Sequence, residues 1–173
     1  MAAVIALAAC NKEQSAEQPG TVAKQTPLEA ELKNKEGQSV GRLRVSEDPN
    51  GVMLRVTVSG LSPGTHGMHV HAVGRCDVPG FLTAGPHWNP IDAQHGRDNP
   101  RGAHLGDLAN IEVGPDGRAE SAFQIAAARL EAGNQPMLDI DGASLVIHAR
   151  PDDYRTDPDG TSGARIACAV IAG

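Results

Sequence analysis

The stretch GVMLRVTVS, residues 51–59, decides the fold class of this chain. Apolar side chains recur in it at every second position, at Val52, Leu54, Val56 and Val58. A period of two is that of a β-strand with one buried face. The residues DPNG at 48–51 are typical of a hairpin turn, so we expect the run SVGRLRVS at 39–46 to be the antiparallel neighbour of this strand.

The same pattern of short apolar runs and turns continues along the chain. GPDG at 114–117 is a second turn of the hairpin kind. The one segment that looks helical, AAARLEA at 126–132, is too short and too poorly capped to matter much. We therefore predict an all-β domain with strands at residues 27–33, 39–46, 51–59, 110–113, 118–125, 144–150 and 164–173.

Composition limits the domain count and the class of partner. A chain of 173 residues fits one domain with some extra, and with only 2% aromatic residues its core must come from Val, Ile, Leu and Ala. The formal net charge of −6, with no basic block, argues against nucleic acid as a partner. It would also repel an anionic substrate, which would need a local positive site.

The stretch HGMHVHAVGRC, residues 66–76, points to a metal. His69 and His71 are separated by one residue, and in a strand two such side chains share one face and can converge on one ion. His148 lies at the end of a later apolar run. His66 is the exception, because a lone strand histidine is more often a satisfied polar residue, and we leave it out of the site.

Two long loops rich in Gly, Pro, Asp and Asn interrupt the strands, at residues 72–110 and 151–163. Loops of this length in a compact domain are usually functional or disordered. The first contains four residues of types that bind zinc, spread along a loop rather than placed on a helix as in a zincin hydrolase. Together with the strand histidines they could form two ligand groups that share one imidazole; they are His87, His95, His104 and Asp107.

The N-terminal residues MAAVIALAAC resemble the end of a bacterial lipoprotein signal, with Cys10 as the lipidated residue. Residues 1–10 would then be the signal segment and residues 11–26 a flexible tether. A start further upstream, or a plain hydrophobic tail, is the alternative; the run is too short for a membrane span of ~20 residues. Setting Cys10 aside leaves Cys76 and Cys168, which favours a disulfide over two unrelated buried thiols.

Five motifs together resemble the copper/zinc superoxide dismutase family, in the family's order and close to its spacing. They are GMHVHAVGRC, GPHWNP, HGRDNPRGAHLGDLANI, LVIHARPDD and GARIACAVI, within residues 27–173. The resemblance implies a Greek-key antiparallel β-sandwich or barrel with two long functional loops. It also implies dismutation of superoxide to oxygen and hydrogen peroxide, with one copper and one zinc per chain.

Carried over position by position, the resemblance assigns each ligand. The copper ligands would be His69, His71, His87 and His148, and the zinc ligands would be His87, His95, His104 and Asp107. His87 would bridge the two metals and take up a proton during the cycle. An all-imidazole set suits copper, and three imidazoles with one carboxylate make a closed zinc site.

The resemblance also assigns residues that are not ligands. Asp152 would accept hydrogen bonds from His69 and His95 and so fix their rings, and Arg165 would attract superoxide to the copper. The alternative without a functional role is that Asp152 is only a turn carboxylate and that Arg165 has only a structural role at the surface. Cys76 and Cys168 match the family's disulfide within one subunit.

Departures from the family pattern set limits to what can be transferred. The loop 151–163 lacks the Glu-Glu-Lys cluster that steers substrate in eukaryotic members, which leaves Arg75, Arg97 and Arg101 as candidates. We expect a homodimer or a monomer in the bacterial periplasm. Lipidation of Cys10 would tether the protein to a membrane. A copper carrier on the same fold and a zinc hydrolase are the rival functions. The carrier is disfavoured because the expected copper ligands and Arg165 are all present. The hydrolase is disfavoured because it would need a general base near the zinc, and the only acidic residues in the matching positions are Asp107 and Asp152, which already have other roles.

Overall fold

The computed structural model describes residues 27–126, 128–133 and 136–171, so the expected signal segment, Cys10 and the tether lie outside the described residues. The described part is built from short strands. Their bounds are β1 Leu28–Asn34, β2 Ser39–Asp48, β3 Gly51–Ser59, β4 Gly64–His66, β5 Met68–His71, β6 Ile111–Val113, β7 Arg118–Ile125, β8 Ala143–His148 and β9 Arg165–Ile171.

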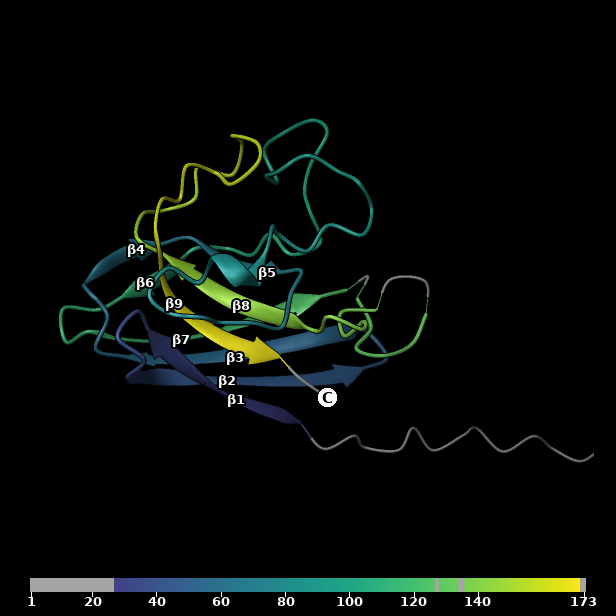
Figure 1. Cartoon of the computed structure of the whole chain (residues 1–173). Helices are drawn as coiled ribbons and strands as arrows, with labels where there is room; N and C mark the ends of the chain where they lie inside the picture. The colour runs from purple at the N-terminus through teal and green to yellow at the C-terminus, as the bar shows by residue number, and fades with distance from the viewer. Residues whose placement is uncertain (1–26, 127, 134–135, 172–173) are drawn as a thin grey trace, which may run out of the picture.

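Seven of these strands form one antiparallel sheet in the order β5-β8-β9-β1-β2-β3-β7, and β4 pairs with β6. Figure 1 shows that the large sheet curls, with β1, β2 and β3 in the lower layer and β5 and β8 above them. Several hydrogen-bonded neighbours are far apart in the chain, such as β9 with β1 and β3 with β7. The predicted all-β Greek-key architecture is confirmed.

The central hairpin forms where the alternation predicted it. In β3 the side chains of Val52, Leu54, Val56 and Val58 are buried. The register of β2 against β3 runs without a shift from Asp48 opposite Gly51 to Gly41 opposite Val58. These side chains pack into the main core between the layers, so the period of two in the sequence sets both the strand and its buried face.

Two local expectations were wrong or incomplete. The described residues of the segment 126–132 form turns and an isolated bridge rather than a helix, because Leu130 N donates to Glu47 Oε2 at 2.6 Å instead of to a preceding turn. The stretch 64–71 forms two short strands in different sheets, which the sequence did not separate. Within the described residues the helical structure is one 3₁₀ turn, Leu82–Ala84, and no helix there is long and apolar enough to cross a membrane.

The two long loops lie next to each other above the sheet (Figure 1). Backbone hydrogen bonds join them, including one from Asp98 N to Tyr154 O at 2.9 Å. The beginning of the first loop is fixed to the sheet by a small separate core in which Phe81 and Ala84 pack against Val146 and Cys168. Both loops are therefore held against β5 and β8, the strands that carry three of the candidate ligands.

Candidate metal centre

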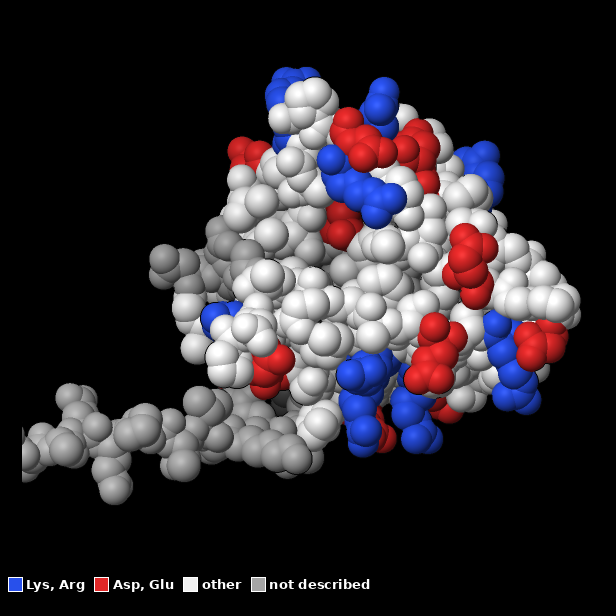
Figure 2. Space-filling view, turned by 180° about the vertical axis from the view of Figure 1, so that it is seen from behind, with Lys and Arg blue, Asp and Glu red and all other residues white. Residues whose placement is uncertain are grey.

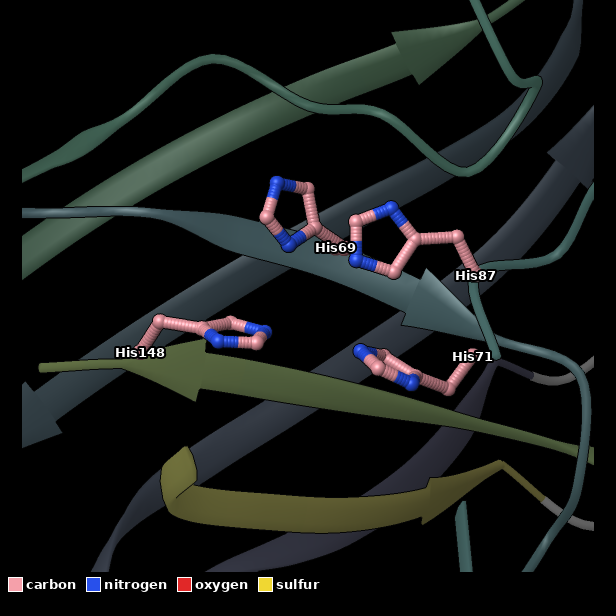
Figure 3. Close-up of side chains that lie close together, drawn as sticks. All are labelled: His69, His71, His87 and His148. Carbon is pink, nitrogen blue, oxygen red and sulfur yellow. The ribbon is translucent and has the colours of Figure 1, made fainter. Parts of the chain in front are cut away.

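Four buried imidazoles converge from three parts of the chain. His69 and His71 come from β5, His148 ends β8, and His87 lies in the first loop, where it forms an isolated bridge with His71. Because β5 and β8 are antiparallel neighbours with His69 opposite Val146 and His71 opposite Ser144, His148 lies on the same face of the pair as both of these histidines. One nitrogen from each ring lies within 4.8 Å of the others, and Figure 3 shows the rings of these residues around a common space.

Each ring in this group has one nitrogen held and one nitrogen free. The held atoms are His69 Nε2, 2.8 Å from Asp152 Oδ2; His71 Nδ1, 2.9 Å from Gly85 O; His87 Nδ1, 3.0 Å from Asp107 Oδ1; and His148 Nδ1, 3.1 Å from Gly163 O. Buried nitrogens without a hydrogen-bond partner among the described residues include His69 Nδ1, His71 Nε2, His87 Nε2 and His148 Nε2. Four such lone pairs facing one space fit a nitrogen-coordinated ion such as copper, and the residues therefore suit the expected group.

The protonation of these rings also suits an ion. Burial, aided by the nearby His87, lowers the pKa of His71 to about 2. Burial, aided by the nearby His69, lowers the pKa of His148 to about 3. Burial likewise lowers the pKa of His87 to about 4, against the opposing effect of Asp107. His71, His148 and His87 are therefore neutral at pH 7, which is the form that binds a metal.

A second group forms around Asp107 in the first loop. Its Oδ1 atom lies 3.0 Å from the Nδ1 atoms of His87 and His95 and 3.1 Å from that of His104. A tetrahedral zinc with bonds of about 2.0–2.1 Å separates its ligands by roughly 3.4 Å, so one ion fits among these four atoms after small shifts. A nitrogen of His69 also lies within 4.8 Å of the ligand atoms of His87, His95 and Asp107. The free nitrogen of His69 is already a member of the first group, so His104, whose Nδ1 contacts Asp107, is the fourth member of the second group.

The carboxylate of Asp107 is strongly favoured in its ionised form. Burial alone would raise its pKa, but hydrogen bonds from His104, His87 and His95 outweigh burial and lower it. Burial would lower the pKa of His95, whereas contacts with Asp107 and Asp152 raise it to about 9. His95 is thus protonated at pH 7 while no ion is bound, and an ion would have to displace that proton.

His87 belongs to both groups. Its Nδ1 faces Asp107 and its Nε2 is one of the free nitrogens of the first group. Asp152 also connects them, because its Oδ2 lies 2.8 Å from His69 Nε2 and its Oδ1 lies 3.0 Å from His95 Nε2. The structure therefore contains two adjacent groups of four candidate ligands that share one ring and one supporting carboxylate.

The comparisons with known proteins agree with this geometry. The family model described as "Copper/zinc superoxide dismutase (SODC)" matches residues 39–171. The chain belongs to the copper/zinc superoxide dismutase family. Matching at this length confirms the family that the five motifs indicated.

Relatives within the superoxide dismutase family carry two kinds of name. The chain is 42% identical to a Cu-Zn superoxide dismutase of Caulobacter vibrioides, over 82% of this chain and 83% of the relative. It is 35% identical to the superoxide dismutase-like protein YojM of Bacillus subtilis, over 100% of this chain and 93% of the relative. The crystal structure of a SOD-like protein from Bacillus subtilis superposes with a TM-score of 0.80 at 37% identity, covering 83% of this chain and 97% of that one.

Arg165 starts β9 and lies opposite His148 in the strand pair. Its guanidinium donates to Phe81 O and Gly85 O, both at 2.7 Å, and Gly85 O also accepts from His71 Nδ1. Burial lowers the pKa of Arg165 from its usual value, but a guanidinium stays charged at neutral pH. In this superoxide dismutase family member, the structure thus places a half-buried positive charge beside the first imidazole group.

The expected disulfide is present between Cys76 and Cys168, which are separated by 92 residues in sequence, with a Cα–Cα distance of 5.7 Å. Cys168 lies in β9 three residues after Arg165, so the bond ties the first loop to the strand that carries the arginine. The loop supplies the carbonyl groups that hold Arg165. The disulfide therefore supports the position of this side chain as well as the fold.

His66 lies outside both groups, as expected. It is buried, and its ring nitrogens lie 2.8 Å from His148 O and 2.9 Å from Ser62 O. Sequence reasoning missed three supporting residues that surround Asp152, namely Asn110, Tyr154 and Gly160. Asn110 belongs to a quoted family motif, but the contact of Tyr154 depends on a loop conformation that no periodic pattern reveals.

Proposed function

We propose that the protein dismutates superoxide, with copper held by the first group and zinc by the second. The ligands would be His69, His71, His87 and His148 for copper and His87, His95, His104 and Asp107 for zinc. The single observation that carries this proposal is the set of four free imidazole nitrogens beside a half-buried arginine. Membership of the superoxide dismutase family supports it.

The chemistry that copper would supply is the transfer of one electron from a first superoxide, released as oxygen, and of one electron to a second. Arg165 attracts the anion, which the net charge of −6 would otherwise repel. Its two bonds to Phe81 O and Gly85 O fix the guanidinium and leave other N–H groups to donate to the substrate.

The second electron transfer needs protons, because peroxide leaves as hydrogen peroxide. His87 Nε2 is a suitable proton carrier, since this nitrogen faces the copper group while Nδ1 is held by the zinc group. The ring keeps its orientation through Asp107 whether or not Nε2 carries a proton. Two superoxide ions and two protons thus give one oxygen and one hydrogen peroxide.

The deciding experiment is the rate of superoxide loss as copper is titrated into zinc-loaded protein, with a His148→Ala variant in parallel. We expect activity to saturate at about one copper per chain and the variant to stay near background, because His148 Nε2 would be one of four ligands. Copper that binds without faster superoxide decay would make the protein a copper carrier or a structural relative of the enzymes.

We also propose that the protein works in the bacterial cell envelope, where it would protect against superoxide. The disulfide supports this location, because such bonds persist in oxidising compartments. Lipidation at Cys10 would add a membrane tether. A Cys10→Ser variant should then move from the membrane fraction to the periplasmic fraction, and the same distribution for both proteins would refute the anchor.

A further inference from the structure

We propose that Tyr154 is a positioning residue that locks Asp152 between the two metal-binding groups. The inference rests on the metal sites of the proposed function and extends them to a residue that is not among the proposed ligands. Tyr154 lies in the second loop, two residues after Asp152. Its backbone, hydroxyl and ring each make a separate contact that bears on Asp152 or on the first loop.

The backbone contact is direct. Tyr154 N donates to Asp152 Oδ1 at 2.7 Å, and the same oxygen accepts from His95 Nε2 at 3.0 Å. Two donors on one oxygen fix the plane of the carboxylate, so that Oδ2 is left facing His69. Loss of the first donor would allow the carboxylate to rotate away from one ring or the other.

The hydroxyl contact closes a ring of hydrogen bonds around Asp152. Tyr154 Oη accepts from Asn110 N at 2.8 Å. The side chain of Asn110 accepts from Asp152 N at 2.9 Å and donates to Asp152 O at 3.0 Å. Asn110 therefore holds the backbone of Asp152 from both sides, and the tyrosine hydroxyl holds Asn110 in turn.

The ring contact reaches the loop that carries the zinc ligands. The guanidinium carbon of Arg97 lies 3.7 Å from the centre of the Tyr154 ring, in the geometry of a cation–π interaction. The neighbouring Gly96 N donates to Asp107 Oδ2 at 2.9 Å, and Asp98 N donates to Tyr154 O at 2.9 Å. Tyr154 thus joins the two loops at the point where one carries Asp107 and the other carries Asp152.

The backbone of Tyr154 is itself unusual. Its φ angle of 60° lies in the left-handed region, which an aromatic residue rarely adopts. Residues in this region persist where the surrounding contacts over-determine them, and they cluster at functional sites. Here this conformation accompanies the bond from Tyr154 N back to the carboxylate two residues earlier.

A coupled effect on both metals separates this role from general support of the fold. Asp152 contacts one ring of each group, so a displaced carboxylate would loosen His69 and His95 together. A residue that only stabilised the loops would lower the melting temperature of the metal-free protein and leave the metal affinities of the folded protein unchanged. The two readouts can be measured on the same variants.

The experiment compares Tyr154→Phe and Arg97→Gln with Arg101→Gln in the full chain. Arg101 is the matched control, because it is an exposed arginine of the same loop. Dissociation constants for zinc and copper are measured separately by chelator competition, and the orientation of the ligands is followed by the absorption of Co²⁺ in the zinc site and the electron paramagnetic resonance of Cu²⁺. For Tyr154→Phe we expect both constants to rise about tenfold, the lower end of the range for residues that hold metal ligands.

Arg97→Gln should raise the dissociation constants of both metals by a smaller factor and alter the Co²⁺ spectrum. Arg101→Gln should have the same dissociation constants and spectra as the wild type. A wild type that binds neither metal would refute the metal sites and this inference with them. If the wild type binds both, the inference alone is wrong when Tyr154→Phe keeps both constants within twofold, loses only one metal, or changes only the melting temperature. If Tyr154→Phe does not fold, the comparison of Arg97→Gln with Arg101→Gln decides by the same criteria.

Discussion

Asp152 accepts a hydrogen bond from His69 across 83 residues of sequence, with 2.8 Å between Oδ2 and Nε2. Burial opposes ionisation of Asp152, but the hydrogen bonds from His69 and His95 outweigh burial and lower its pKa, so the carboxylate can only accept. Nε2 of His69 is therefore the donor in this hydrogen bond, and Nδ1, which has no hydrogen-bond partner among the described residues, is the nitrogen that belongs to the first group. One carboxylate thus decides which nitrogen of this ring is available to an ion.

The first prediction concerns removal of that charge. Asp152→Asn should raise the dissociation constants of both copper and zinc about 10- to 100-fold, because an amide holds the two imidazoles less firmly. Asp153→Asn is the control, since Asp153 is exposed and its carboxylate, among the described residues, bonds to Arg155, Thr156 and Thr161 of its own loop. Chelator competition measures both constants. Equal behaviour of the two variants would show that Asp152 is only a turn residue.

The second prediction concerns the space beside the same carboxylate. Gly160 has a φ of 62°, and a methyl group there would collide with Asp152 Oδ1 and lie 2.6 Å from His95 Nε2. Gly160→Ala should therefore raise the dissociation constant of zinc more than tenfold. Gly37→Ala controls for the backbone strain, since Gly37 has a φ of 79° and nothing within 4 Å of the added methyl group. A zinc affinity that falls equally in both variants would rule out the collision as the cause.

The strands and the convergence of the candidate histidines could be predicted from sequence because their signals are local or belong to a family pattern. Alternation marks Val52 to Val58 as a strand, and the spacing of His69 and His71 places both on one face. The support of Asp152 could not be predicted in this way. Asn110, Tyr154 and Arg97 meet through loop conformations and a left-handed backbone, and these depend on tertiary contacts rather than on any repeated pattern.

The dependence of loop conformation on tertiary contacts also explains why the sequence could not predict where the arginines of the first loop lie relative to the imidazoles. Of the candidates for substrate guidance, Arg75 pairs with Asp77 at 2.5 Å and Arg97 lies on Tyr154. Both side chains make local contacts, which disfavours them as the residues that guide the substrate. Arg165 is the arginine that the structure holds beside the imidazoles.

The third prediction follows from that placement. Arg165→Gln should lower kcat/KM for superoxide by about tenfold or more and leave the metal content unchanged, because it removes a positive charge that attracts the substrate but is not a ligand. The loss should shrink as ionic strength rises, since salt screens the attraction. Arg75→Gln is the matched control. Equal kcat/KM values for the two variants at low salt would exclude substrate attraction by Arg165.

The fourth prediction concerns the disulfide. Replacing Cys76 and Cys168 together by Ser should lower the free energy of unfolding by about 2–5 kcal/mol, because the bond closes a long loop in the unfolded chain. Denaturant unfolding measures this loss. The first loop would also be free to shift, so kcat/KM should fall because Phe81 O and Gly85 O no longer hold Arg165 firmly. Full activity in the folded double variant would show that the small core around Phe81 is sufficient.

The fifth prediction concerns the pH dependence of the metal-free protein. The folded-state pKa values of His71, His148 and His87 are lowered to about 2, 3 and 4 from 6.5. Between pH 6.5 and about 4.5 the unfolded chain therefore binds up to about three more protons than the folded chain, and stability falls as pH falls, by more than 1 kcal/mol per pH unit. His95, raised to about 9, has the opposite sign: its contribution is complete below pH 6.5 and is lost as pH rises through 9.

Stability of the metal-free protein should therefore be greatest near pH 6.5–7 and decline on both sides. Denaturant unfolding after chelation of metals, repeated across this range, measures the curve. His148→Gln removes one of the three protons and should reduce the acid slope by about a third, which separates the ligand histidines from the surface carboxylates as the cause. A flat profile between pH 6.5 and 4.5 would mean that these rings are exposed to water in the metal-free state, and the convergent geometry would then have to be formed by the metal rather than by the fold.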